Sequence, residues 1–61
     1  MTRREFAIAR ENARVEFAAR ISSETGYDVD VDGDDYVVYE GVNEVYRSEV
    51  GQNVEKFCYN W

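Results

Sequence analysis

The feature that most constrains this fold is a strict alternation of apolar and acidic side chains. It runs through six residues, Tyr27-Asp28-Val29-Asp30-Val31-Asp32. Because successive side chains of a β-strand point to opposite faces, the pattern predicts a strand with one buried face and one solvated face. A single strand is not stable alone, so the chain must supply further strands and an apolar layer to cover the buried face.

A tight turn follows this strand. Gly33 lies between Asp32 and Asp34, and these residue types tolerate the positive φ angles of hairpin turns. The segment Tyr36-Val37-Val38-Tyr39 then provides a returning strand. Whether the loop is Asp32-Gly33 or Gly33-Asp34, the same side chains share one face. We therefore predict a hairpin over 27–40 with an inner face of Tyr27, Val29, Val31, Tyr36 and Val38.

The N-terminal third predicts a long helix over residues 3–24. The segment Thr2-Arg3-Arg4-Glu5 fits a capping box, in which Thr2 and Glu5 each accept a hydrogen bond from the other's backbone amide. Residues that favour helices continue through Arg20, and Gly26 suits the left-handed residue at a helix C-terminus. The predicted core-facing stripe has helical spacing: Phe6, Ala9, Ala13, Phe17 and Ile21.

A second, weaker apolar stripe lies on another side of the same helix, at Ile8, Val15 and Ala19. One interpretation is that the helix buries more than one of its sides in a small core. The other is that this stripe contacts a second copy of the chain, which predicts a homodimer. The sequence does not decide between them.

The segment after Gly41 allows several interpretations. Apolar residues fit helical spacing across twenty positions, although Gly51 interrupts the pattern. A short helix or irregular turn over 43–50 followed by a strand is a second interpretation, and a hairpin of 44–50 with 54–61 is a third. We favour a final strand over about 54–61, because aromatic residues are concentrated there.

These elements predict one α+β domain over residues 1–61, with the long N-terminal helix packed on a small antiparallel sheet made of hairpin 27–40 and the C-terminal strand. A domain of this size buries only about 60% of its unfolded surface, so its stability margin is thin. The lone Cys58 excludes an internal disulfide, and the absence of histidine excludes a Cys/His metal site.

Charge is unevenly distributed along the chain, whose formal net charge is −6. Residues 1–20 carry five arginines against three glutamates, which is +2, and residues 21–61 carry two basic against ten acidic residues, which is −8. No segment is apolar enough for a signal peptide or a membrane span. We expect a cytoplasmic protein without a membrane partner.

The string from Asp28 to Asp34 resembles the start of an EF-hand calcium loop, with acids at positions 1, 3 and 5 and glycine at position 6. Position 8 is Asp35 and position 12 is Tyr39, where the motif has an apolar residue and a bidentate glutamate. Valines at positions 2 and 4 favour an extended chain. The acidic hairpin is therefore the better interpretation, with calcium binding as the alternative.

Catalytic chemistry has little support in the sequence. Without histidine the usual general base at neutral pH is absent. Cys58 lies in an apolar aromatic run, which raises a thiol's pKa and lowers its reactivity. We expect a protein that is not an enzyme and has no cofactor.

Three arginines share one side of the helix, Arg3, Arg10 and Arg14, so nucleic-acid binding has to be considered. Phosphate binding needs a net positive face. Glu11 and the acidic remainder of the chain oppose a duplex, so direct nucleic-acid binding is not expected.

The acidic hairpin is the strongest candidate site. Alternate strand residues lie about 6.6–6.8 Å apart, which is on the scale of successive phosphates of a nucleic-acid strand. In size, acidity and lack of catalytic groups the chain resembles small phage-encoded inhibitors, including anti-CRISPR, anti-restriction and DNA-mimic proteins. That resemblance implies a blocker of the basic surface of a larger, nucleic-acid-handling protein. The alternative is a solvated edge that protects against aggregation. The residues expected to carry the contact are Asp28, Asp30, Asp32, Asp34, Asp35, Tyr36, Tyr39 and Glu40.

Overall fold

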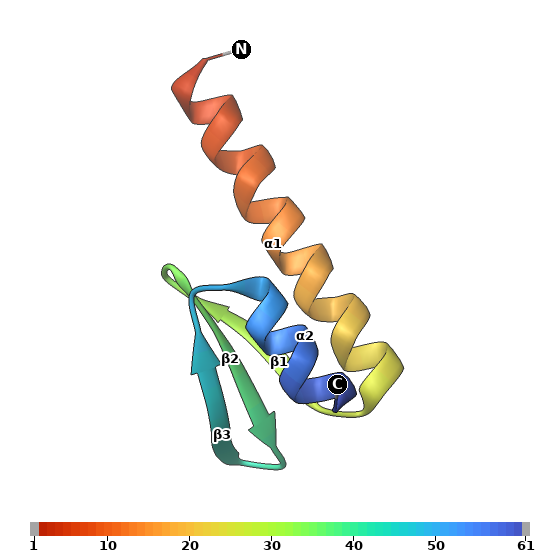
Figure 1. Cartoon of the computed structure of the whole chain (residues 1–61). Helices are drawn as coiled ribbons and strands as arrows, with labels where there is room; N and C mark the ends of the chain where they lie inside the picture. The colour runs from red at the N-terminus through yellow and green to blue at the C-terminus, as the bar shows by residue number, and fades with distance from the viewer. Residues whose placement is uncertain (1, 61) are drawn as a thin grey trace.

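The computed structural model describes residues 2–60 and has the α+β fold that the sequence predicts. The long helix α1 (Arg3–Thr25) precedes a three-stranded antiparallel sheet and a short C-terminal helix (Figure 1). The remaining elements are β1 (Asp28–Asp32), β2 (Asp35–Glu40), β3 (Asn43–Ser48) and α2 (Gly51–Tyr59).

Local hydrogen bonds explain both ends of α1. The Thr2 hydroxyl accepts from the Glu5 amide at 3.2 Å, and the Glu5 carboxylate accepts from the Thr2 amide at 3.1 Å. At the other end Gly26 adopts a φ of 83°, and its N–H donates to the Ser22 carbonyl. The capping box and the terminal glycine are confirmed, and the helix ends one residue beyond the predicted range of 3–24.

The three strands lie in the order β1-β2-β3 and are connected by two short turns. In the first hairpin Asp32 pairs with Asp35, so the loop is Gly33-Asp34, with Gly33 at a φ of 60°. In the second hairpin Glu40 pairs with Asn43 across a loop that begins at Gly41. The predicted hairpin is confirmed, since the structure has β1 and β2 within residues 27–40.

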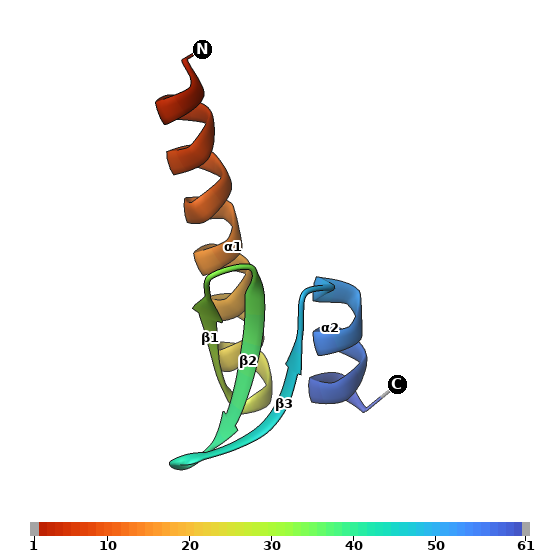
Figure 2. The same ribbon diagram turned by 90° about the vertical axis from the view of Figure 1, so that its left-hand side faces the viewer.

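Both helices cover the same face of the sheet. Ala18 and Ile21 of α1 and Val54 and Cys58 of α2 are buried in one cluster with the inner face of the strands. The sheet residues of that cluster are Val29, Tyr36 and Val38. Figure 2 shows α1 along the β1 side of the sheet and α2 beside β3. The fold therefore has two layers, and the outer face of the sheet is left without a helix.

The predicted strand over 54–61 is wrong, because residues 51–59 form α2. Val54, Phe57 and Cys58 have i, i+3, i+4 spacing, which turns them to one side of a helix toward the sheet. Trp61, which the strand prediction included, lies outside the described residues. The third strand comes earlier, at β3, close to the 44–50 strand of the third interpretation, whereas a helix or irregular turn over 43–50 is not formed.

Gly51 allows α2 to begin close to α1. A Cβ atom at this position would lie 3.1 Å from two ring carbons of Phe17, which is tighter than ordinary packing allows. Ser48 supports the same connection, because its hydroxyl accepts hydrogen bonds from the Val50 amide and the Asn53 side chain.

The predicted core stripe of α1 is correct only at its C-terminal end, for two of its five residues. Ile21 is fully buried and Phe17 is half-buried, but Phe6 is 63% exposed, and Ala9 and Ala13 are exposed as well. A helix of 23 residues is about 35 Å long, whereas strands of five or six residues reach only ~17–20 Å. The N-terminal half of α1 therefore extends beyond the sheet, as Figure 1 shows. Within residues 2–60, no helix combines the length and the apolar character that crossing a membrane requires.

Candidate functional site: the acidic face of the sheet

The outer face of the sheet carries most of the residues that the sequence marked as a binding site. Pairing places Asp28 beside Tyr39, Asp30 beside Val37 and Asp32 beside Asp35 on this side. Strand β3 adds Arg47 opposite Val37 and Glu44 opposite Tyr39. We call this surface the acidic face, and it comprises Asp28, Asp30, Asp32, Asp35, Val37, Tyr39, Glu44 and Arg47.

Arg47 binds three of the five carboxylates of the acidic face. Its guanidinium lies 2.9 Å from Asp35 Oδ2, 2.8 Å from Glu44 Oε1 and 3.2 Å from Asp32 Oδ2. The hydrogen bonds to Asp35 and Glu44 raise the pKa of Arg47 further above its ordinary value. This cluster was not predictable from the sequence, because it depends on the register of β3.

Asp28 and Asp30 are the carboxylates that this arginine does not reach. Both are exposed, and neither makes an ion pair with another described residue. Their spacing along β1 is about 6.8 Å. The uncompensated negative charge of the acidic face is therefore concentrated at the β1 edge of the sheet.

The centre of the acidic face is closely packed although no helix covers it. Val37 is completely buried, and its cross-strand neighbours on this side are Asp30 and Arg47. Tyr39, two residues along the same strand, is half-buried. The acidic face therefore has a closely packed centre with charged side chains around it.

Three of the predicted site residues lie elsewhere. Tyr36 is only 8% exposed and packs against Phe17 with ring centroids 5.2 Å apart, so its role as a partner-binding anchor is wrong. It belongs to the inner face because β2 alternates. Asp34 is exposed in the first turn, beyond the strands.

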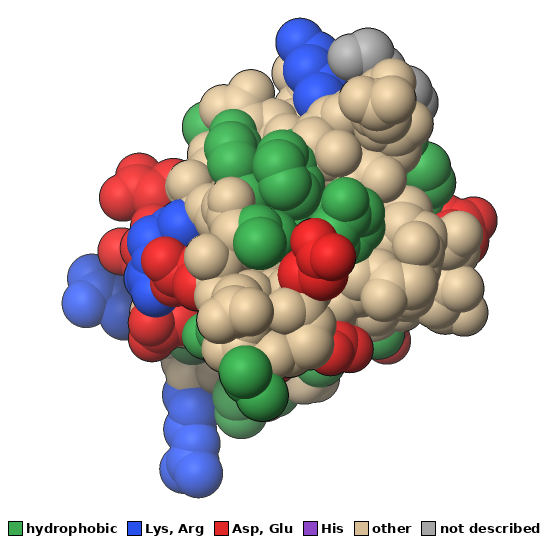
Figure 3. All heavy atoms as spheres, turned by 90° about the horizontal axis from the view of Figure 1, so that it is seen from below, with side chains coloured by type: hydrophobic (Ala, Val, Ile, Leu, Met, Phe, Trp, Pro, Cys, Tyr) green, Lys and Arg blue, Asp and Glu red, His purple; other side chains and the backbone are tan. Residues whose placement is uncertain are grey.

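Glu40 lies at the far end of β2, in register with the inner face. It lines a shallow hollow with Thr25, Gly26 and Tyr27. Figure 3 views the molecule from below and shows apolar side chains gathered on that side, with acidic and basic side chains crowded together at the left margin. Glu40 is therefore separate from the acidic face.

The calcium alternative finds no support in this geometry. Asp28, Asp30 and Asp32 belong to an extended strand and project in a row, whereas an EF-hand loop curls its ligands around the ion. Among residues 2–60, the structure does not bring three carboxylate or thiol side chains together in an arrangement that could hold a metal ion.

Arg14 has a role that the sequence did not indicate. Its Nη1 donates to the Gly33 carbonyl at 2.6 Å, its guanidinium lies 5.1 Å from the centre of the Tyr36 ring, and it pairs with Glu11 at 3.6 Å. Only 13% of its side chain is exposed. It joins α1 to the hairpin tip, so Arg14 is not free to bind a phosphate.

Cys58 is buried, and desolvation raises the pKa of its thiol. The pKa of Tyr59 is raised as well, chiefly because its hydroxyl donates a hydrogen bond to Glu24. A folded-state pKa above the unfolded value stabilises the fold at low pH and loses that contribution as pH rises. Unfolded thiols titrate near about 8.5 and unfolded tyrosines near about 10.

We therefore expect the urea midpoint to fall between pH 7.5 and 9.5. Urea titrations at both pH values, followed by circular dichroism, measure this fall. In Cys58→Ala the fall should be smaller, because the buried thiol no longer titrates. An equal fall in both proteins would show that Cys58 makes no contribution.

No protein family, no curated protein sequence and no solved structure matches this chain. The function of the acidic face must therefore be inferred from its own residues.

Proposed function

We propose that this protein is a non-enzymatic binding module that blocks a basic surface on a larger, nucleic-acid-handling protein. One observation carries the proposal: the acidic face sets five carboxylates against a single guanidinium on one helix-free side of the sheet. Ordinary solubility is served by mixed charges, and a concentration of one sign costs stability through self-repulsion. Such a surface is better explained by a partner of opposite charge.

The distribution of the bound carboxylates suggests how the face works. Arg47 fixes Asp32, Asp35 and Glu44, while Asp28 and Asp30 remain available to a partner's arginines or lysines. Their spacing of about 6.8 Å lets two cations that normally contact successive phosphates engage both aspartates. Tyr39 and the packed centre add a contact that is not purely electrostatic.

Removal of the two free carboxylates should therefore weaken the complex without unfolding the protein. The variant Asp28→Asn/Asp30→Asn should associate at least about tenfold more slowly with the partner at low salt. Its thermal stability should be unchanged or slightly higher, because two like charges on one strand no longer repel each other. Association of the unaltered protein should slow steeply as salt rises, since exposed charges are screened.

The matched control is Glu16→Gln/Glu49→Gln, which changes the net charge equally at exposed positions outside the acidic face. The three proteins are immobilised for capture from a cell lysate, and the captured partner is then tested for competition with its nucleic acid. The control should bind within about twofold of the unaltered protein. Equal losses of binding in the two variants would show that the interaction depends on net charge alone. Undiminished binding of Asp28→Asn/Asp30→Asn would show that the acidic face is not the binding site.

A further inference from the structure

Strand β1 is an edge of the sheet, and the register shows which of its backbone groups face outward. The two-residue loop closes on the pair Asp32 and Asp35, which is therefore a hydrogen-bonded pair of the antiparallel ladder. By alternation, the backbone N–H and C=O groups of Asp28, Asp30 and Asp32 point toward β2. The N–H and C=O groups of Val29 and Val31 then point away from the sheet. The Val29 N–H supports this assignment, because it donates to the Ser22 hydroxyl at 2.7 Å.

Helix α1 holds both ends of this edge. Ser22 binds the Val29 N–H near the start of β1, and Arg14 binds the Gly33 carbonyl just past its end. Between these two anchors, no described residue pairs with the Val29 carbonyl or with the N–H and C=O of Val31. The middle of the edge therefore offers one backbone donor and two acceptors.

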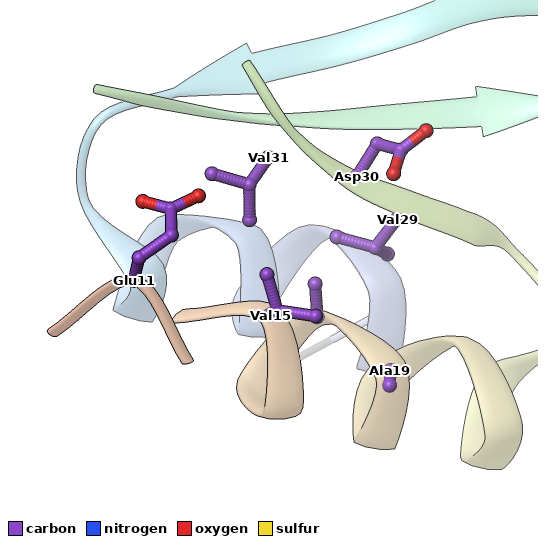
Figure 4. A pocket seen from close by; sticks show the side chains of 7 residues that line it. Glu11, Val15, Ala19, Val29, Asp30 and Val31 are labelled. Atoms are coloured by element: carbon purple, nitrogen blue, oxygen red, sulfur yellow. The ribbon is translucent and has the colours of Figure 1, made fainter. Parts of the chain in front are cut away.

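A hollow of ≈ 230 Å³ lies beside these open groups, between α1 and β1. Figure 4 shows Val29 and Val31 reaching from the strand toward the helix, with Val15 directed toward them and Asp30 turned to the other side. Alanines at positions 18 and 19 leave the space between the two elements. Val15, which is 50% exposed, gives the hollow an apolar wall that solvent reaches.

We infer that this edge receives an extended segment of the partner in which basic residues alternate with small apolar residues. The inference rests on the proposed function and specifies its binding mode. A strand added to β1 between the two anchors would place alternate side chains beside Asp30 and Asp32, where lysine or arginine is complementary. The side chains between them would enter the hollow, whose walls accept valine, alanine or threonine.

The backbone groups set the register of this segment. A partner residue opposite Val31 can exchange two hydrogen bonds with it, and the Val29 carbonyl accepts a third. A second copy of β1 fits poorly in this position, because its aspartates would lie on the same side as those of the first copy. Like charges on adjacent strands are destabilising.

The test uses short capped peptides in place of the unidentified partner. One alternates lysine with valine and threonine, and the other has the same composition with all lysines first. The alternating peptide should bind at least about tenfold more tightly, a difference of ~1.4 kcal/mol. It should also slow hydrogen exchange of the Val31 amide, which the lysine-block peptide should leave unchanged.

Two alanine variants separate the hollow from the helix surface. Ala19→Gln fills the hollow with an uncharged side chain, and Ala13→Gln makes the same change on an exposed part of α1 outside it. The first should weaken binding of the alternating peptide about tenfold, and the second should change it less than about twofold. Equal effects of the two variants would overturn the edge site.

The outcomes distinguish this inference from the proposed function. If both peptides bind equally, and both are lost in Asp28→Asn/Asp30→Asn, strand addition is overturned while charge-based docking stands. If neither peptide binds better to the unaltered protein than to that variant, both proposals fall. If light scattering shows a dimer, and the Val31 amide is protected without peptide, a second copy occupies the edge and the partner assignment is wrong.

Discussion

Replacement of Ile21 with alanine is expected to unfold a large fraction of the protein at room temperature. The side chain is fully buried between α1 and the sheet, so its truncation removes apolar contacts and leaves a cavity. Such changes cost about 2–5 kcal/mol. A domain of 61 residues has a total stability of roughly 3–9 kcal/mol, so this single change removes a large share of it.

Phe6→Ala is the matched comparison, because the sequence places both residues on the same predicted stripe. Phe6 is 63% exposed, and its loss should shift the urea midpoint very little. Phe17→Ala should be intermediate, since the ring is half-buried against Tyr36. Urea unfolding of the three variants, followed by circular dichroism, ranks them. A loss in Phe6→Ala as large as in Ile21→Ala would mean that a second chain covers the N-terminal half of α1.

The contrast between these residues shows what helical periodicity can and cannot predict. The spacing of apolar residues correctly gives the helix, and the capping box and Gly26 give its ends. Periodicity does not show how far the covering layer extends. That length depends on the strands, and here the sheet ends well before the helix does.

The favoured interpretation of the segment after Gly41, a final strand over 54–61, was wrong for a related reason. In a chain of this size a short apolar segment fits strand and helix patterns equally well, and tertiary packing decides between them. The turn at Gly41 returns the chain as β3, which places Tyr46 against Phe57 with stacked rings 4.7 Å apart. This contact connects β3 to α2, and neither the helical nor the strand spacing of apolar residues predicts it.

The candidate site was predictable to the extent that it follows from strand alternation. The alternation in 27–32 places Asp28, Asp30 and Asp32 on one face, and the hairpin register adds Asp35 and Tyr39. The partial neutralisation by Arg47 was not predictable, because it requires β3 beside β2. Since Arg47 pairs with Asp32 and Asp35, two of these four carboxylates, the uncompensated negative charge covers a smaller part of the face than the sequence suggested.

Replacement of Arg14 with alanine is expected to destabilise the protein by about 1–3 kcal/mol. The Gly33 carbonyl loses its donor, the Tyr36 ring loses its cation, and a largely buried side chain is removed. Backbone amides around the turn between β1 and β2 should also exchange hydrogen faster, because Arg14 no longer holds this turn to α1. Thermal unfolding and amide exchange measure the two effects separately.

Arg14→Met should recover much of the lost stability, although it restores no hydrogen bond. Methionine refills the space over Tyr36, and it also removes Nη2, a buried nitrogen of Arg14 that has no hydrogen-bond partner within residues 2–60. Arg10→Ala, at an exposed position of the same helix, should change stability by less than about 0.5 kcal/mol. If Arg14→Met and Arg14→Ala lose equal stability, the charge and its hydrogen bond to Gly33 hold the hairpin tip. If methionine recovers most of it, packing on Tyr36 is the larger contribution.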